Sequence, residues 1–236
     1  MICLVDERIS AACERSLLKR GYRIVKMPKC ERLSAPIASH PDMLLFLHND
    51  RLISSADYCE RYPYVFSDIR EMGKNVARTF TEDMQKSEYP HDAIFNALTV
   101  KNYIFYKEDT VSAAIKEYAK GAGLTAIPTK QGYPACTTLA FGGAAITADR
   151  GMARVMSEVG IKVTLIENGG ISLSPYDYGF IGGAAGVANG EVYFLGNLDL
   201  HPSCGIIKKA TLDEGYTPIS LSDEPLIDLG RILFID

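Results

Sequence analysis

Several features that would assign this chain to a broad class are absent from its 236 residues. No stretch approaches about 18 consecutive apolar residues, so we expect no membrane-spanning segment and no membrane partner. The formal net charge is -4, which gives no general attraction to nucleic acid or to an anionic surface. The stretch MICLVDERIS has an acidic residue at position 6 and no basic run, so we expect no secretory signal.

The six cysteines are scattered, and no two of them form a CxxC pair. In a chain of this length, scattered cysteines argue for reduced thiols and against a disulfide framework. The same scatter argues against a structural zinc site. We therefore expect a cytoplasmic protein with no bound metal and no cofactor.

The composition, 47% hydrophobic and 23% charged, is typical of a globular protein, and a repeated pattern runs through it. In the first copy, Ile9, Cys13 and Leu17 are spaced as on one face of a helix. Gly21 then suits the end of that helix, and YRIV reads as a strand. Four later glycines follow comparable segments and precede strand-like runs: Gly73, Gly123, Gly160 and Gly215.

Each copy has a second half, in which a polar loop with a proline leads to two short apolar runs around a turn. The prolines are Pro41, Pro90, Pro134, Pro175 and Pro225. The expected turns are at Asn49-Asp50, Lys101-Asn102, Gly142-Gly143, Asn189-Gly190 and Gly230. Gly-Gly and Asn-Gly between strand-like runs are strong hairpin signals. We interpret the chain as five copies of helix, glycine, strand, proline loop and hairpin.

One such unit cannot bury its helix face and its sheet face alone, so neighbouring units must stack. An open array would need atypical units at its two ends, and the sequence shows none. We therefore predict a closed ring with helices outside and hairpins inside. The predicted fold is a single α/β domain over residues 1–236, a five-bladed α/β propeller with pseudo-five-fold symmetry.

Five αββ-type units in 236 residues resemble the pentein, or guanidine-modifying enzyme, superfamily. That superfamily includes arginine and agmatine deiminases, dimethylarginine hydrolases, amidinotransferases and a non-catalytic ribosome anti-association factor. The resemblance rests on architecture along the whole chain. It implies a five-bladed α/β propeller and, in the enzymes, a central pocket with a cysteine nucleophile, a histidine acid/base and carboxylates that grip a guanidinium. Those enzymes carry the cysteine in the last unit, which here reads SLSDEPLIDLGRILFID, so no catalytic residue is transferred.

In a ring, the loops that precede the hairpins point at the same axial pocket. The first two loops, SHPDM and YPHDA, contain His, Pro and Asp in permuted order, and the third reads YPAC. Three neighbouring units would thus present two histidines, two carboxylates and a thiol. The candidate residues of the five loops are His40, Asp42, His91, Asp92, Tyr133, Cys136, Asn168, Tyr176, Asp177, Asp223 and Glu224.

These residue types suit nucleophilic catalysis. A thiol must become a thiolate to attack, and a histidine held by a carboxylate can take its proton. In this hypothesis Cys136 is the nucleophile, His91 is the acid/base, and Asp92 orients His91 or anchors the substrate. His40 and Asp42 form a second polar pair. The expected substrate contacts are Tyr133, Asn168, Asp177 and Asp223.

The leading hypothesis is a thiol-dependent hydrolase or transferase acting on a small polar, guanidinium-type molecule. Paired aspartates can hold a guanidinium bidentately, and thiol addition to its carbon would expel ammonia or an amine. The alternative is a non-catalytic protein of the same fold that binds a partner or senses a small molecule. Each candidate also has a structural interpretation. Cys136 equally suits core packing, Asp92 and Asp42 suit turn capping, and Asp223 suits a solvated turn.

Overall fold

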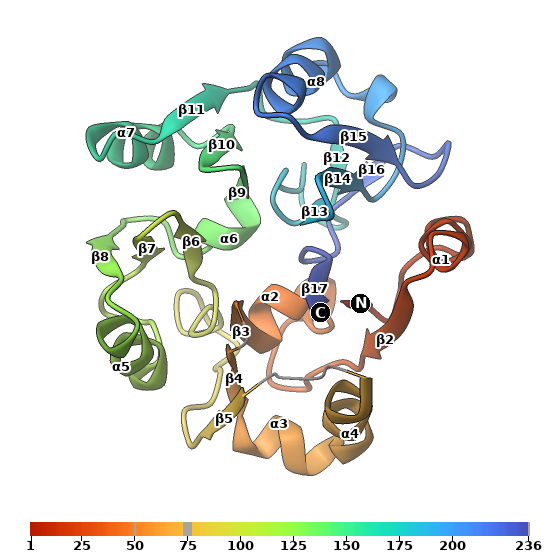
Figure 1. Ribbon diagram of the computed structural model, residues 1–236. Helices are drawn as coiled ribbons and strands as arrows, with labels where there is room; N and C mark the ends of the chain where they lie inside the picture. Colours follow the sequence, from red (N-terminus) through yellow and green to blue (C-terminus); the bar gives the residue numbers. More distant parts are fainter. Residues whose placement is uncertain (50, 73–76, 236) are drawn as a thin grey trace.

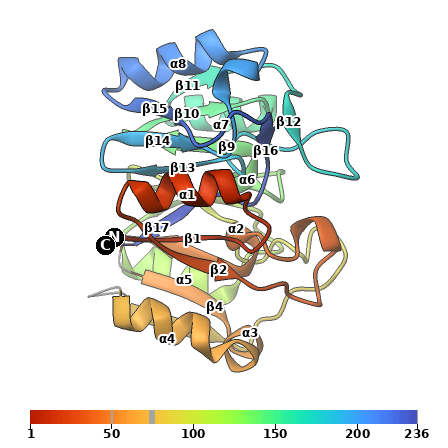
Figure 2. The ribbon, with the colours of Figure 1, turned by 90° about the vertical axis from the view of Figure 1, so that its right-hand side faces the viewer.

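The computed structural model describes residues 1–49, 51–72 and 77–235. Two sequence predictions, the second residue of the Asn49-Asp50 turn and the helix end at Gly73, fall outside these residues. In Figure 1 the strands lie nearer the middle of the molecule and the longer helices lie at its periphery, with the two chain ends close together. Figure 2 shows the same arrangement from the side.

Within the described residues, five three-stranded sheets share one pattern. In each sheet the first strand pairs antiparallel with the second, and the third runs parallel to the second. Four of these sheets are continuous in sequence and contain the hairpins predicted after Pro41, Pro90, Pro134 and Pro175. They are β3–β4–β5 (Leu45–His48, Arg51–Ser55, Ala77–Thr81), β6–β7–β8 (Leu98–Val100, Tyr103–Tyr106, Thr125–Pro128), β9–β10–β11 (Thr138–Phe141, Ala144–Thr147, Lys162–Leu165) and β13–β14–β15 (Ala185–Ala188, Glu191–Phe194, Thr217–Ser220).

The fifth sheet joins the two ends of the chain. Strand β17 (Leu233–Ile235) pairs antiparallel with β1 (Ile2–Asp6), which pairs in parallel with β2 (Arg23–Met27). The predicted fifth hairpin around Gly230 is therefore wrong. The preceding run instead contains β16 (Leu226–Ile227), which pairs in parallel with β12, formed by residues 171–172. Two adjacent apolar runs do not reveal whether they pair with each other or with distant strands.

Five helices of nine or ten residues within the described ranges lie at the periphery (Figure 1). None of the described helices is long and apolar enough to cross a bilayer. Glycines with positive φ follow four of them, as predicted: Gly21, Gly123, Gly160 and Gly215. The helices are α1 (Ala11–Lys19), α4 (Pro63–Met72), α5 (Ala113–Gly121), α7 (Arg150–Glu158) and α8 (Cys204–Asp213).

Two of the predicted proline loops are short helices that lead directly into a strand. α2 (Pro41–Leu44) precedes β3, and α6 (Pro134–Thr137) precedes β9. Proline suits the first turn of a helix because the first N–H groups have no intrahelical acceptor. The other short helices are α3 (Ala56–Arg61), η1 (Ala35–Ile37) and η2 (Leu198–Leu200).

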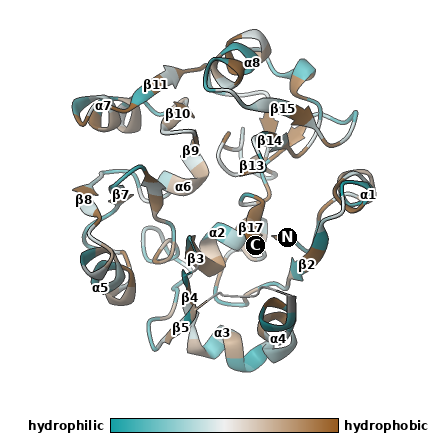
Figure 3. Ribbon diagram, in the orientation of Figure 1, coloured by the Kyte–Doolittle hydropathy of each residue, from teal (hydrophilic) through white to brown (hydrophobic). Residues whose placement is uncertain are grey.

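Buried apolar side chains of neighbouring sheets pack together and form the core. One buried cluster includes Ile2 and Ile235 from the chain ends, Met43 and Leu44 from α2, and Cys136 from α6. In Figure 3, strands β3 and β17, near the middle, are drawn mainly in the hydrophobic colour. Met43, Leu44 and Cys136 anchor α2 and α6 in this cluster, and this packing fixes the positions of the two helices.

Candidate functional site

A cavity of about 470 Å³ lies beside α2 and α6, and we call it the central cavity. Side chains from loops and short helices between the sheets contribute to its wall, so segments distant in sequence meet there. Its lining residues are Ile37, His40, Met43, Tyr89, Tyr133, Cys136, Leu173, Tyr176, Asp177, Tyr178, Phe180 and Asp228. The sequence hypothesis named five of these, His40, Tyr133, Cys136, Tyr176 and Asp177.

Cys136 lines the central cavity with only 5% of its surface exposed. Its thiol donates a hydrogen bond to Asp42 Oδ2 over 2.9 Å. The Asn96 amide nitrogen donates to Cys136 Sγ over 3.1 Å and to the Asp42 carbonyl over 3.2 Å. Asn96 Oδ1 accepts from the Ala135 amide over 2.8 Å. Asn96 therefore holds α2 and α6 together behind the thiol.

Two buried carboxyl groups surround the thiol. Burial raises the pKa of Asp42 to about 6. Burial, and then the nearby Asp42, raise the pKa of Asp228 to about 7. Asp228 accepts from the Phe180 amide over 2.9 Å and the Gly230 amide over 3.0 Å. Burial, followed by the negative charges of Asp42 and Asp228, raises the pKa of Cys136 well above its ordinary value, so the resting group is a thiol.

His40, 1% exposed, lies between two carboxyl groups. Its Nε2 is 3.9 Å from Asp6 Oδ2, and its Nδ1 is 3.9 Å from Asp228 Oδ1. Among the residues that the structure describes, neither ring nitrogen has a hydrogen-bond partner. Burial, and then the charge of Arg8, lower the pKa of His40 to about 3, so the imidazole is neutral at neutral pH.

Arg231 adds a cationic group near the thiol. It adopts a positive φ of 71°, which is uncommon outside glycine, and its Nε has no hydrogen-bond partner in the described part of the chain. Burial lowers the pKa of Arg231, while the negative charges of Asp42 and Cys136 act in the opposite direction. The positive charge of Arg231 and the carboxyl group of Asp228 therefore both lie near Asp42.

The expected Cys136–His91 pair is not formed. His91 is exposed, whereas the hydrogen bonds of Cys136 lead to Asp42 and Asn96. Asp92 is buried and accepts from the Tyr133 hydroxyl over 2.6 Å, and burial raises the pKa of Asp92. The physical reason is loop length.

The following strand begins four residues after Pro41 and four after Pro134, but eight after Pro90. The longer loop brings Asn96, instead of the His-Asp pair, beside the thiol.

Of the four predicted substrate contacts, two lie at the central cavity and two lie elsewhere. Asp177 is exposed at the central cavity, and Tyr133 lines it. Asn168 lines a second, neighbouring cavity. Asp223 is exposed in a groove beside α1 and β15 and does not line the central cavity.

Sequence reasoning missed Asn96, Asp228, Asp6 and Arg231. The DLGR stretch that holds Asp228 and Arg231 surrounds the predicted fifth turn at Gly230, and an Asp two residues before a turn glycine is a usable signal.

Aromatic side chains form much of the central cavity. The rings of Tyr89 and Tyr133 lie 5.2 Å apart, and those of Tyr178 and Phe180 lie 6.3 Å apart. Aromatic faces attract organic cations, and a desolvated cation gains more from them than a solvated one. Together with the Asp228 carboxyl, this lining suits a small organic cation. In the described part of the chain, no group of three or more His, Cys, Asp or Glu is arranged to hold a metal ion.

Residues 4–233 match one protein family, described as a family of unknown function, DUF6873. No curated protein matches the sequence.

Solved structures of guanidine-modifying enzymes are similar in fold. The amidinotransferase SxtG from Microseira wollei aligns with a TM-score of 0.55 and 12% identity, over 89% of this chain and 72% of that chain. A dimethylarginine dimethylaminohydrolase variant, as its adduct with S-methyl-L-thiocitrulline, aligns with a TM-score of 0.55 and 12% identity, over 94% and 92%. A Cys-to-Ser variant of the Pseudomonas aeruginosa enzyme with citrulline gives 0.53 and 11%, over 94% and 92%. The predicted resemblance is confirmed: the chain has the fold of the pentein superfamily.

Proposed function

This chain belongs to the family DUF6873, and we propose that it is a hydrolase or transferase acting on a small guanidinium-type cation in the central cavity. The observation that carries the proposal is the Cys136 thiol, hydrogen-bonded to Asp42 in the wall of a cavity that also presents Asp228 and aromatic rings. The proposal includes a closed five-bladed propeller, with the three-stranded sheets as blades and the central cavity on its axis.

A bound cation would stabilise two carboxylates whose charged forms are unfavourable in the free protein. Burial disfavours the charged forms of Asp42 and Asp228, and at Asp228 the nearby Asp42 charge adds to this effect. A positive charge nearby favours both carboxylates and offsets that cost. The rings of Tyr133 and Tyr178 would cover the cation, and Asp177 stands at the exposed side of the same cavity.

The cation would also activate the thiol. Its charge favours ionisation of Cys136, and Asp42 accepts the proton across the existing hydrogen bond. The thiolate forms a C–S bond to the guanidinium carbon, and one C–N π pair moves to nitrogen. The proton on Asp42 passes to the departing nitrogen as the C–N bond breaks, releasing ammonia or an amine. Water in a hydrolase, or an acceptor amine in a transferase, then displaces Cys136 from the thiouronium adduct.

A second candidate function is binding of the same cation without turnover, as in a sensor. One observation favours it: burial and two carboxylates raise the pKa of Cys136, which opposes thiolate formation in the free protein. Both functions use the same cavity, and they differ only in whether a bond to sulfur forms.

The test combines binding with trapping of the adduct. Methylguanidine and agmatine are titrated calorimetrically, with neutral methylurea as the matched control, and acid-quenched samples are examined by intact mass spectrometry. We expect the guanidines to bind, methylurea not to bind, and a covalent adduct to form on Cys136. The adduct should be absent in Cys136→Ser and present in Cys30→Ser, which alters another buried thiol of the same core cluster.

Binding without any adduct or released amine would favour the sensor. Absence of binding to every guanidine would overturn both candidates. Two variants test where the cation binds. Asp228→Asn changes the wall of the cavity, and Asp177→Asn changes its exposed side, where a substitution is less damaging to the fold.

A further inference from the structure

Hydrolysis of the Cys136 adduct needs a group that takes a proton from the attacking water, because neutral water is a weak nucleophile. Near the thiol, Asp42 is buried and accepts from Cys136 over 2.9 Å. The two oxygens of Asp228 accept from the amides of Phe180 and Gly230. Another part of the cavity wall carries a third carboxylate, connected to the cavity through a tyrosine hydroxyl.

Tyr133 is that tyrosine, and it lines the central cavity together with Cys136. Its hydroxyl donates to Asp92 Oδ2 over 2.6 Å. Asp92 is 4% exposed and is not one of the lining residues, so the Tyr133 hydroxyl connects this buried carboxylate to the cavity. The arrangement places a proton carrier at the wall and a base directly behind it.

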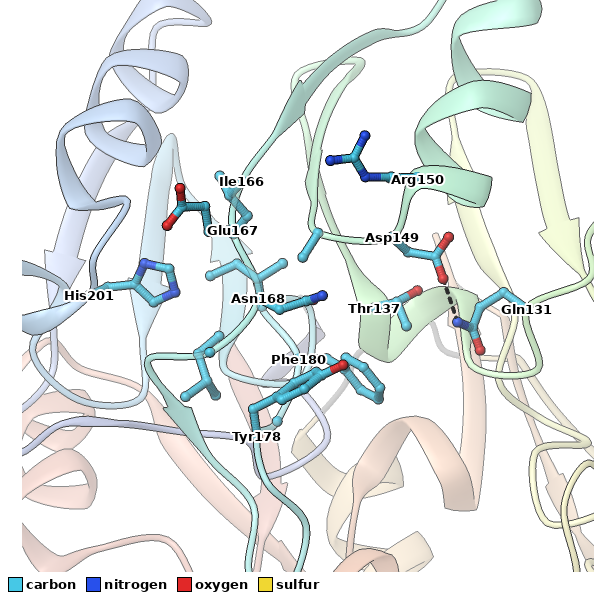
Figure 4. A pocket seen from close by; sticks show the side chains of 15 residues that line it. Gln131, Thr137, Asp149, Arg150, Ile166, Glu167, Asn168, Tyr178, Phe180 and His201 are labelled. Atoms are coloured by element: carbon cyan, nitrogen blue, oxygen red, sulfur yellow. Dashed lines mark hydrogen bonds between the residues drawn. The ribbon is translucent and has the colours of Figure 1, made fainter.

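The backbone of Tyr133 is held at the start of α6, three residues before Cys136. Its carbonyl accepts from the Thr137 amide over 2.9 Å, and its amide donates to Gln131 Oε1 over 3.1 Å. Gln131 is held in turn, because its Nε2 donates to Asp149 Oδ2 over 2.7 Å (Figure 4). The hydroxyl and the thiol therefore belong to one fixed segment.

The ring of Tyr133 is fixed as well. It lies 5.2 Å from the ring of Tyr89, centroid to centroid. Tyr89 also packs against Gly132, where a Cβ would overlap the Tyr89 ring. Glycine at position 132 thus permits the close approach of Tyr89, which supports Tyr133 from the side.

The protonation states suit transfer from Tyr133 to Asp92. Burial, the bond to Asp92, and the negative charges of Asp92 and Cys136 raise the pKa of Tyr133, so its hydroxyl keeps the proton at neutral pH. The effect of Cys136 also means that the phenol and the thiol are close enough to interact. Burial raises the pKa of Asp92, which makes it a stronger base than an ordinary aspartate, although the Tyr133 bond opposes this effect.

We propose that Tyr133 and Asp92 relay the proton from the water that attacks the Cys136 adduct. This inference rests on the proposed function, in its hydrolase form. The water oxygen forms a bond to the thiouronium carbon, and one C–N π pair moves to nitrogen. One water proton passes to Tyr133 Oη while the Tyr133 proton passes to Asp92 Oδ2.

The C–S bond of the resulting neutral intermediate then breaks. Sulfur takes the bonding pair and the proton of the new hydroxyl, which restores the Cys136 thiol and releases a urea. Asp92 finally returns its proton to solvent through Tyr133. Formation of the adduct uses Asp42 and not this relay, so the two halves of the reaction can be tested separately.

The experiment follows the adduct over time. The whole chain is mixed with methylguanidine, samples are quenched in acid, and intact mass spectrometry measures the fraction of Cys136 adduct. In Tyr133→Phe and in Asp92→Asn the adduct should still form, and its breakdown should slow about 100-fold or more. Phenylalanine keeps the ring against Tyr89. Asparagine keeps an acceptor for the Tyr133 hydroxyl but is not a base, so a bond with a merely structural role would be preserved.

The matched control is Tyr62→Phe. Tyr62 packs against the same core cluster as Tyr133, and its hydroxyl donates to the Lys29 carbonyl over 2.9 Å. Adduct breakdown in this variant should match that of the unaltered chain. The pH dependence gives a second readout: breakdown should level off in the unaltered chain once Asp92 is ionised. In Tyr133→Phe and Asp92→Asn it should keep rising about tenfold per pH unit, because hydroxide needs no relay.

An adduct that forms in the unaltered chain and breaks down at the same rate in Tyr133→Phe and Asp92→Asn would overturn the relay and leave the proposed function intact. Normal breakdown in Asp92→Asn alone would also overturn it, since the bond would then be structural. If neither variant folds, the unaltered chain decides, because breakdown that never levels off with pH excludes the relay. Absence of any adduct in the unaltered chain would overturn the proposed hydrolase and the relay together.

Discussion

The Cys136 thiol donates to Asp42 across 94 residues of sequence, over 2.9 Å, and this bond joins α6 to α2. Both groups are buried; the Asp42 carboxylate raises the pKa of Cys136, whereas the hydrogen bond donated by Cys136 lowers the pKa of Asp42 and opposes the larger effect of burial. The free protein therefore holds a neutral thiol against a carboxyl group whose pKa is raised to about 6. Either a cation or removal of one partner should change the protonation of the other.

Asp42→Asn is expected to stabilise the fold at about pH 8 and to have little effect near pH 4. The pKa of Asp42 is about 6 in the folded protein, above its ordinary value. Below the ordinary value, both the folded and the unfolded chain bind the proton, so stability does not change with pH. Between the ordinary value and about 6, the unfolded chain loses the proton while the folded protein keeps it, so stability falls by about 3 kcal/mol and then stays constant at higher pH.

Asparagine is neutral throughout, and its Oδ1 can still accept from Cys136. Urea unfolding of both proteins at about pH 4, 6 and 8 measures the free energy of unfolding. A difference that stays constant across this range would contradict the shifted pKa.

The same substitution is expected to increase alkylation of Cys136 by iodoacetamide several-fold at about pH 8. Removal of the Asp42 charge eliminates one of the effects that raise the pKa of Cys136. The half-buried Cys59 is an internal standard, and peptide mass spectrometry gives both rates.

Because Asp42→Asn should also stabilise the fold, faster labelling could not come from unfolding. An unchanged ratio of Cys136 to Cys59 labelling would mean that Asp42 does not control the thiol.

Local sequence patterns predicted much of the fold. Four helices end at predicted glycines, and four hairpins form where short apolar runs flank a turn, because these features depend on a few neighbouring residues. The pairing of β1 with β17 joins opposite ends of the chain, and no local pattern encodes it. Closure of the ring as five blades of one domain stays a prediction.

The site was less predictable, because it depends on loop length. Cys136 and Asp42 were identified, since each lies within four residues after the proline of its loop. His91 and Asp92 were assigned the same position from the neighbouring proline, yet four further residues in that loop bring Asn96 there instead. A coil segment has no periodicity from which such an offset could be read.

Asn96→Ala is expected to lower the free energy of unfolding by about 1–3 kcal/mol. Asn96 is 1% exposed, and its loss leaves the buried Ala135 amide without its acceptor. The matched control is Asn168→Ala at an exposed position, which should change stability by less than about 0.5 kcal/mol. Urea unfolding of the two variants measures the difference, and equal values would show that Asn96 does not brace α2 and α6.

Gly230→Ala is expected to destabilise the protein far more than Gly190→Ala. Both glycines have left-handed φ values, +68° and +73°, so alanine is strained at either position by about 1 kcal/mol. A Cβ at position 190 has no heavy atom within 4 Å, whereas one at position 230 overlaps the Cβ of His40. The overlap should add several kcal/mol, measured as the difference between the two variants in urea unfolding.

A second substitution tests the cause. The atoms of His40 that the new methyl group would meet include its Cα and Cβ as well as its ring. His40→Ala keeps that Cβ and should not rescue Gly230→Ala, whereas His40→Gly removes it and should recover part of the loss. The stability of each double variant is corrected for the effect of its single change at His40. If the two corrected values are equal, contact with the His40 Cβ is not the reason for glycine at position 230.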